Sequence, residues 1–280
     1  MRQTVSRRSL LKLGAMATAA YATGLNLFAA DSANRIPIGV QLYSVRQACE
    51  KDLPATLEAI ARMGYKGVEF AGYYGRSATQ LRKLLDDNGL KCSGTHTAWD
   101  TLNERNFKAT IEFNKTIGNK FLIVPSLPGG REASAEACKE TGKMFTALAE
   151  KAKADGMRVG YHAHGGDFKK FDGETAWDII FSNSSPDVVM QLDLGNSMDG
   201  GGDPYAILKK FPGRATTIHL KPHGKAGAVL GEDDVRWDEV WKLCEEPGKT
   251  EWYIVEYEED PAKTDSIKRC IDNLKKMGKC

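Results

Sequence analysis

Short runs rich in β-branched residues alternate with amphipathic segments from residue 35 onward, and this order restricts the fold more than any other feature. The intervening segments, such as LPATLEAIARMGY at 53–65, repeat apolar residues every three or four positions, as helices that cover a sheet do. Eight strand and helix pairs in roughly 250 residues predict an α/β fold, a closed (β/α)8 barrel. The predicted strands are 36–44, 66–72, 91–97, 119–125, 158–164, 188–193, 215–221 and 252–258.

An open doubly wound sheet is the alternative arrangement for this order of elements. The chain lacks the G-x-G-x-x-G that would follow the first strand of a dinucleotide-binding sheet. Helix ends are marked locally: Asp203 before Pro204 fits an N-terminus, and Gly64 and Gly156 fit C-termini. We therefore expect a single (β/α)8 TIM barrel over residues 31–280.

The N-terminal segment has the features of an export signal. Arg7 and Arg8 precede a moderately apolar, Ala-rich stretch that ends in small residues. This pattern is similar to the twin-arginine signal that the Tat translocase reads, so residues 1–30 are predicted to be cleaved near Ala29 or Ala30. A membrane anchor is the alternative, but Thr, Tyr and Asn interrupt the stretch. The prediction is a periplasmic protein with no stable membrane anchor.

Charge and cysteine content exclude several classes of protein. With 39 basic against 37 acidic residues, and no basic block beyond the N-terminus, nothing indicates binding to nucleic acid or to a membrane surface. None of the six cysteines is at C-x-x-C spacing, and a domain of this size does not need disulfides. We expect mostly buried thiols, with a Cys270–Cys280 pair left open.

Polar residues gather at the carboxyl ends of the predicted strands. In a (β/α)8 barrel these ends and the loops after them form the active face. All five histidines of the chain fall on this rim, including His223 in the loop after the seventh strand. Besides His223, the rim residues are Gln41, Tyr43, Glu69, His96, His162, His164, Asp193, Asn196, His219, Lys221 and Glu256.

Three of these residues point to a metal ion. Asp193, His219 and Glu256 each follow an apolar run, where a buried carboxylate costs several kcal/mol unless a cation or a donor meets it. A lone histidine at a strand end is ordinarily a hydrogen-bonded core residue, but several together weaken that interpretation. Two carboxylates and two neutral imidazoles from strands five to eight would suit Mn²⁺, Co²⁺, Zn²⁺ or Fe²⁺, with room for water or substrate.

Six segments carry a resemblance to a known family: GVQLYSVR, GYKGVEFAGYYG, YHAH, QLDLGN, IHLK and IVEYE. In this order they resemble the xylose isomerase-like barrels, a family of sugar phosphate isomerases and epimerases that also includes inosose dehydratases and metal-dependent apurinic endonucleases. The resemblance covers essentially the whole predicted domain. It implies one divalent metal, with substrate oxygens reached by Lys221 and His96. The implied ligands are His162, Asp193, His219 and Glu256.

One residue departs from the pattern of that family. Many members carry a glutamate at position 162, which pairs with the strand-eight glutamate to move a proton across a sugar carbon. His162 cannot act as a base while its lone pair holds a metal, so two-base epimerisation is in doubt and elimination remains open. Strict alternation places His162 and His164 on the same side of the strand, so which of them binds the metal is undecided.

These observations lead to a functional hypothesis with alternatives. The chain is expected to be a metal-dependent sugar isomerase or epimerase that abstracts a proton next to the carbonyl of a free carbohydrate or keto-sugar. Glu256 would be ligand and base, with His164, Lys221 or His96 carrying the second proton. Further substrate contacts are predicted from the rim residues Glu69, Gln41 and Asn196.

The alternatives are a keto-sugar lyase or dehydratase, a keto-glycoside-cleaving enzyme on the same metal, and a non-catalytic sugar-binding barrel. Endonuclease action is opposed by the near-neutral charge and the export signal.

Two loops receive predictions of their own. The segment PSLPGGRE at 125–132 follows the fourth strand and is expected to border the pocket. The segment VLGEDDVRWDEVW after the seventh strand carries Asp233 where the family usually has glycine. Its Trp237 is expected to pack against the barrel rather than to stack on a sugar.

Overall fold

The computed structural model describes residues 35–247 and 249–280. The predicted export signal at residues 1–30 lies outside these ranges. No helix in the described part of the chain has the length and apolar character needed to cross a membrane.

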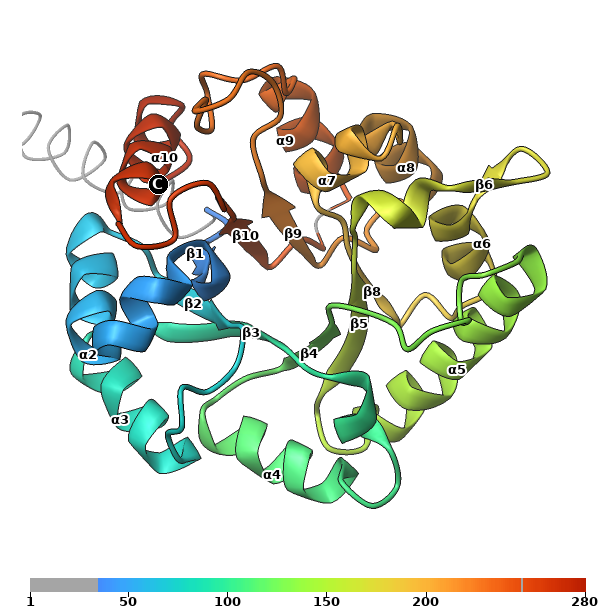
Figure 1. The fold of residues 1–280 in the computed structure, drawn as a ribbon, viewed down its shortest axis with the longest axis horizontal. Helices are drawn as coiled ribbons and strands as arrows, with labels where there is room; N and C mark the ends of the chain where they lie inside the picture. Colours follow the sequence, from blue (N-terminus) through green and yellow to red (C-terminus); the bar gives the residue numbers. More distant parts are fainter. Residues whose placement is uncertain (1–34, 248) are drawn as a thin grey trace, which may run out of the picture. The chain divides into compact units, whose positions relative to one another are not determined.

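Eight parallel strands form one sheet in the order β8-β5-β4-β3-β2-β1-β10-β9, and each falls within a predicted strand. The two ends of this order meet through a bridge between Asp193 and His219, so the sheet curls into a nearly closed barrel (Figure 1). The single (β/α)8 barrel is confirmed, and the open doubly wound sheet is wrong. The strands are β1 (Ile38–Gln41), β2 (Gly67–Phe70), β3 (Lys91–His96), β4 (Phe121–Val124), β5 (Arg158–His162), β8 (Val189–Gln191), β9 (Thr217–Leu220) and β10 (Trp252–Val255).

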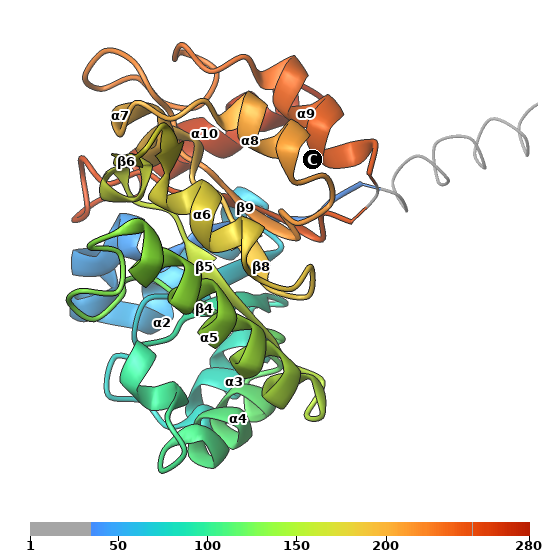
Figure 2. The same cartoon turned by 90° about the vertical axis from the view of Figure 1, so that its right-hand side faces the viewer.

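Helices surround the strands, and Figure 2 shows α5 and α6 on the outer side of β5. A small hairpin of β6 (Lys170–Phe171) and β7 (Glu174–Thr175) lies in the connection after β5. The helices are α2 (Arg46–Met63), α3 (Ala78–Asp87), α4 (Phe107–Thr116), α5 (Ala135–Lys153), α6 (Ala176–Ser182), α7 (Leu194–Asp199), α8 (Pro204–Lys210), α9 (Trp237–Glu245) and α10 (Asp265–Lys276), with 3-10 turns at η1 (Leu42–Val45), η2 (Trp99–Leu102) and η3 (Gly165–Phe168).

Side-chain caps explain where several helices begin. The Asp203 carboxylate accepts hydrogen bonds from the backbone N–H groups of Tyr205 and Ala206, with Pro204 at the first helical position of α8, as predicted. Helix α2 kinks at Asp52, whose carboxylate accepts from the Ala55 N–H. Gly64 ends α2 in the left-handed conformation, with a φ of 105°.

The interior of the barrel is apolar at one end and polar at the other. Phe121, Ile123, Val189, Trp252 and Ile254 form one buried cluster. Because alternate residues of a strand share a face, the next interior positions on β8 and beyond β10 are polar. The apolar cluster therefore forms a floor beneath the polar residues at the carboxyl ends of the strands.

The cysteines behave as small apolar residues. No disulfide joins any of the six, all of which lie in the described part of the chain. Cys280 is exposed and the other five are buried, so the open Cys270–Cys280 pairing does not form here.

Candidate active site

Four side chains from the last four strands of the barrel converge at its carboxyl end. His162 ends β5, Asp193 follows β8, His219 lies in β9 and Glu256 follows β10. Each offers one potential ligand atom, and these atoms all lie within 4.8 Å of one another. The four residues are at most 3% exposed. The structure thus brings together the four residues that the resemblance implied as ligands.

One carboxylate oxygen of Asp193 has no hydrogen-bond partner among the described residues. Its Oδ1 accepts a hydrogen bond of 2.7 Å from the Asn196 N–H, because Asp193 caps α7. Its Oδ2 is buried and has no hydrogen-bond partner among the described residues. Burial raises the pKa of Asp193 to about 7. A buried orphaned carboxylate oxygen is the observation expected where a cation completes the site.

His219 lies between two carboxylates. Its Nδ1 is 2.7 Å from Glu256 Oε2, and its Nε2 is 2.7 Å from Glu69 Oε2. Burial would lower the pKa of His219, but the Glu69 and Glu256 carboxylates raise it to about 10. Burial would likewise raise the pKa of Glu256, yet His219 holds it well below its ordinary value. In this arrangement the imidazolium substitutes for a metal cation as the countercharge.

The donor set fits a divalent metal ion. His219 Nδ1 faces Glu256 Oε2 and is 3.8 Å from Asp193 Oδ2, so nitrogen and oxygen donors face a common point. His219 Nε2 would remain on Glu69, giving the carboxylate–histidine–metal chain that is frequent at metal sites. Two imidazole nitrogens and two carboxylate oxygens suit Mn²⁺, Co²⁺, Zn²⁺ or Fe²⁺.

Glu69 and Gln41 lie beneath the cluster. Both are 0% exposed, and the Gln41 amide donates to Glu69 Oε2 over 2.7 Å. Burial would raise the pKa of Glu69, but His219 and His96 hold it well below its ordinary value. Both residues were predicted to contact substrate. The structure contradicts this prediction, because both side chains are fully buried and neither lines the cavity.

Gln191 is a central residue that the sequence interpretation missed. It is fully buried on β8 and contacts two of the histidines and Glu69. Its position two residues before Asp193 was an available signal, because it places both side chains on the same face of the strand.

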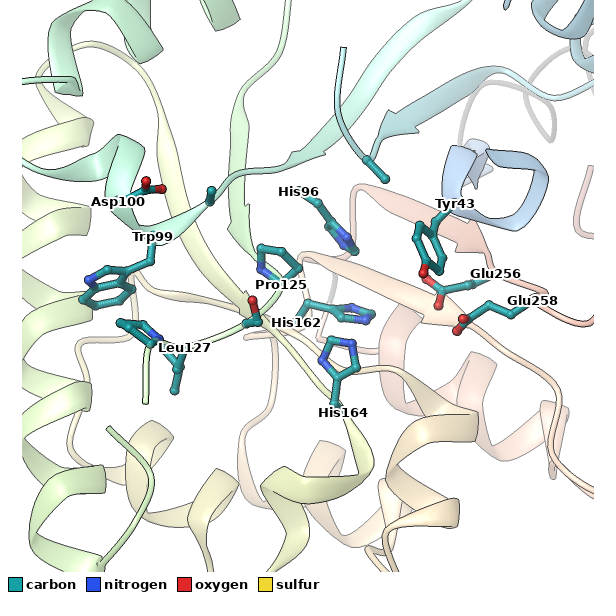
Figure 3. Close-up of a pocket in the computed structure, with 14 residues that line it drawn as sticks. Tyr43, His96, Trp99, Asp100, Pro125, Leu127, His162, His164, Glu256 and Glu258 are labelled. Carbon is teal, nitrogen blue, oxygen red and sulfur yellow. The ribbon is translucent and has the colours of Figure 1, made fainter. Parts of the chain in front are cut away.

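A cavity of about 610 Å³ opens above the cluster (Figure 3). Sites for small molecules are typically about 300–1,000 Å³. Residues 125–128 line one side, which confirms that the PSLPGGRE loop borders the pocket. The lining residues are Tyr43, Ala71, His96, Ala98, Trp99, Asp100, Pro125, Ser126, Leu127, Pro128, His162, His164, Glu256 and Glu258.

His164 lies at the rim of this cavity. Its ring centroid is 4.8 Å from that of His162, but His164 does not belong to the four-residue cluster. Its backbone N–H donates to Asp167 Oδ2 over 2.6 Å, which fixes the start of η3. Burial lowers the pKa of His164, so the ring is neutral at pH 7 and can accept a proton.

Lys221 and Asn196 form the side of the site next to Glu256. Lys221 Nζ donates to Asn196 Oδ1 over 2.8 Å, contacts Glu258, and lies 3.5 Å from Glu256 Oε1. Lys221 lines a neighbouring cavity of about 310 Å³, and Asn196 lines neither this cavity nor the larger one. Asn196 therefore holds Lys221 and the Ala163 carbonyl, its second partner at 3.0 Å.

Glu258 is a second residue that the sequence interpretation missed. It lines both cavities and pairs with Lys221. Burial and the neighbouring Glu256 charge raise its pKa. Alternation from Glu256 could have identified it, because two residues further along an extended strand face the same side.

The chain is a (β/α)8 barrel with a cluster of two histidines and two carboxylates at the carboxyl ends of β5, β8, β9 and β10. Residues 57–277 match the model of the xylose isomerase-like TIM barrel, and the chain belongs to this family. The family expected from the sequence segments is confirmed.

Two curated relatives and one solved structure illustrate the similarity. An inosose dehydratase of Lacticaseibacillus casei is 26% identical over 255 residues, which cover 77% of this chain and 85% of that protein. The rhizopine catabolism protein MocC of Rhizobium meliloti is 25% identical over 249 residues, covering 75% of each. A sugar phosphate isomerase/epimerase from Parabacteroides distasonis superposes with a TM-score of 0.73 at 25% identity, over 85% of this chain and 97% of that one.

Proposed function

We propose that this protein is a metal-dependent enzyme that abstracts a proton next to the carbonyl of a free carbohydrate or keto-sugar, as an isomerase or epimerase does. The main support for this proposal is Asp193 Oδ2, a buried carboxylate oxygen without a hydrogen-bond partner among the described residues. It lies in the cluster of four potential ligands beneath the cavity of about 610 Å³. The relatives named as inosose dehydratase and sugar phosphate isomerase/epimerase support chemistry on sugars.

Each residue of the proposed site has a distinct role in the reaction. When bound by His162, Asp193, His219 and Glu256, the metal would polarise the substrate carbonyl and stabilise negative charge on its oxygens. Glu256 lines the cavity and takes the proton from the carbon. Lys221, held by Asn196, keeps a positive charge beside Glu256 Oε1.

Two residues that line the cavity can transfer the second proton of the reaction, the one that Glu256 does not take. His164 is exposed at the rim of the cavity and has a lowered pKa, so its ring is neutral at pH 7 and can take up a proton. Glu258 faces the same cavity with a raised pKa. Either can serve the side of the substrate that Glu256 does not reach.

A keto-sugar dehydratase or lyase, including a keto-glycoside-cleaving enzyme, is the second candidate. The observation that favours it is His162, because an imidazole in place of a strand-five glutamate removes the carboxylate that would pair with Glu256 in symmetrical two-base epimerisation. Elimination needs one base and one acid, which Glu256 and Glu258 supply. The relatives named as inosose dehydratases agree with this chemistry.

The metal content and the proton transfer can both be measured directly. Elemental analysis of the purified protein should find a divalent transition metal. Proton-exchange NMR in deuterated water, with a panel of free and oxidised sugars, should show deuterium entering next to a carbonyl. Failure of every sugar to exchange or to be converted would reject the enzyme and leave a sugar-binding barrel.

Replacement of the proposed base supplies a decisive variant. Glu256→Gln should lower the exchange rate by about 100-fold or more, because an amide cannot take the proton. Circular dichroism should show the fold retained. The matched control is Glu251→Gln, since Glu251 is half-exposed, pairs with Arg158 and does not line the cavity. Equal exchange rates in the two variants would exclude Glu256 as the base.

We also propose export to the periplasm through the Tat translocase, which rests on the paired Arg7 and Arg8. Export favours a free sugar over a phosphorylated one, because sugar phosphates are chiefly cytoplasmic intermediates. Fractionation of cells expressing the wild-type chain and an Arg7→Lys, Arg8→Lys variant would test this. Export of both alike would contradict it.

A further inference from the structure

We propose that Gln191 is a positioning residue that fixes His162 as the tautomer with the proton on Nδ1, so that Nε2 is the nitrogen offered to the metal. This inference rests on the metal-dependent function proposed above. Gln191 is fully buried at the end of β8 and lines neither of the two cavities described above. The structure places His162, and not His164, in the four-residue cluster, and the proposal specifies which nitrogen of His162 would bind the metal.

The orientation of the Gln191 amide follows from its neighbour Glu69. Gln191 Nε2 lies 2.8 Å from Glu69 Oε1 and 3.0 Å from Thr217 Oγ1. Glu69 already accepts from the Gln41 amide and faces His219 Nε2, each over 2.7 Å, so its carboxylate acts as an acceptor in this layer. The reversed amide would place two oxygens 2.8 Å apart in a fully buried site with no proton between them. The NH₂ group of Gln191 therefore faces Glu69.

The carbonyl of Gln191 then faces the histidines. Gln191 Oε1 lies 3.1 Å from His162 Nδ1 and 3.2 Å from His96 Nε2. A carbonyl oxygen can only accept, so both of these ring nitrogens must carry a proton. A neutral imidazole has one N–H, which leaves the lone pair of His162 on Nε2. Metal ligation requires such a lone pair, and the hydrogen bond at the other nitrogen decides where it lies.

The chain of contacts thus runs from Glu69 through Gln191 to His162. Glu69 also accepts from His219 Nε2 over 2.7 Å, which leaves Nδ1 of His219 for the metal. One buried carboxylate consequently sets the donor nitrogen of both histidine ligands, directly for His219 and through Gln191 for His162. Loss of a residue that hydrogen-bonds to a metal ligand typically weakens metal binding about 10- to 100-fold.

The test compares Gln191→Met with Gln41→Met in metal-free protein. Both variants remove an amide that donates to Glu69, but no histidine ring among the described residues hydrogen-bonds to Gln41. Nitrogen-15 NMR of the imidazoles should show His162 protonated on Nδ1 in the wild type and in Gln41→Met, and should lose that signature in Gln191→Met. Chelator competition should show Zn²⁺ affinity lowered about 10- to 100-fold in Gln191→Met and near the wild-type value in Gln41→Met.

Several outcomes would overturn the inference. A wild-type spectrum with the His162 proton on Nε2 would do so without any variant, which covers the case of a Gln191→Met protein that does not fold. Equal Zn²⁺ affinities of the two variants would also do so. Neither readout involves a sugar, so a protein that binds Zn²⁺ in this way but converts no sugar would reject the proposed function and leave this inference standing.

Discussion

At the scale of single residues, the polar layer under the cluster depends on a missing side chain. A Cβ atom at Gly94 would lie 2.4 Å from Glu69 Oε1. The pairing of β2 with β3 shifts register between Val68 and Glu69, which places Gly94 directly beside Glu69. The buried carboxylate that holds His219 and Gln191 therefore fits only because residue 94 has no side chain.

Gly94→Ala is predicted to displace Glu69 and to weaken both folding and metal binding. Overpacking of this kind costs about 1–3 kcal/mol. Urea unfolding should show that loss, and chelator competition should show weaker Zn²⁺ binding. Gly129→Ala is the control, because no described atom lies within 4 Å of its added Cβ and its φ is not in the left-handed region. A Gly94→Ala protein that matches this control in both measurements would contradict the prediction.

At the scale of elements, the loop between β9 and α9 is held by Asp233. Its Oδ1 accepts a hydrogen bond of 2.8 Å from the Trp237 indole N–H, at the first residue of α9. Trp237 is buried and stacks on Trp241 with ring centroids 5.3 Å apart. The expectation that Trp237 packs inside the domain is confirmed, and this residue lines neither cavity described above.

The pH dependence of stability should report on Asp233. Burial raises its pKa to about 6, and its Oδ2 has no hydrogen-bond partner among the described residues. Because the folded pKa is above the unfolded value near 3.8, the folded state holds the extra proton between about pH 4 and 6. This residue therefore reduces stability as the pH rises through that window, and the full penalty applies above it.

Asp233→Asn removes this charge and keeps an oxygen for Trp237. We expect the variant to gain about 1 kcal/mol over the wild type at pH 7.5, a value discounted for partial exposure, and to show no gain at pH 4. Urea unfolding at a series of pH values measures the difference. Parallel stability profiles of the two proteins across this range would show that the Asp233 charge carries no penalty.

At the scale of the whole domain, the weakest junction of the barrel lies at the proposed metal site. The Asp193–His219 bridge joins the end of β8 to β9, and the His219 N–H donates to the Leu192 carbonyl over 2.9 Å. The other neighbouring strands pair over at least two residues in the sheet. Two of the four proposed ligands, Asp193 and His219, face each other across this seam.

Added metal is predicted to strengthen the seam more than the rest of the barrel. At about 100 times its dissociation constant, Zn²⁺ should stabilise the folded state by about 2.7 kcal/mol. Hydrogen exchange should slow in residues 189–193 and 217–221 more than in 67–70 and 91–96. Asp193→Asn should lose the local protection and most of the rise in Tm. A uniform slowing over all strands would place the metal elsewhere.

The sequence by itself determined the alternation of strands and helices, the closed barrel and the rim to which its polar residues belong. These follow because parallel strands of a barrel share one carboxyl end, so residues that end different strands meet there. His162, Asp193, His219 and Glu256 could be placed together on this basis and on the family resemblance. The burial of Trp237 and the border formed by residues 125–128 were also predicted.

The tertiary structure decided the depth of each side chain along the barrel axis. Alternation tells which face a residue takes, but not its height, which depends on strand register and on irregularities such as the shift between β2 and β3. Gln41 and Glu69 therefore lie under the histidines rather than in the wall of the cavity, and Gln191 lies with them there. The roles of these residues arise from contacts between strands far apart in sequence, which no local pattern encodes.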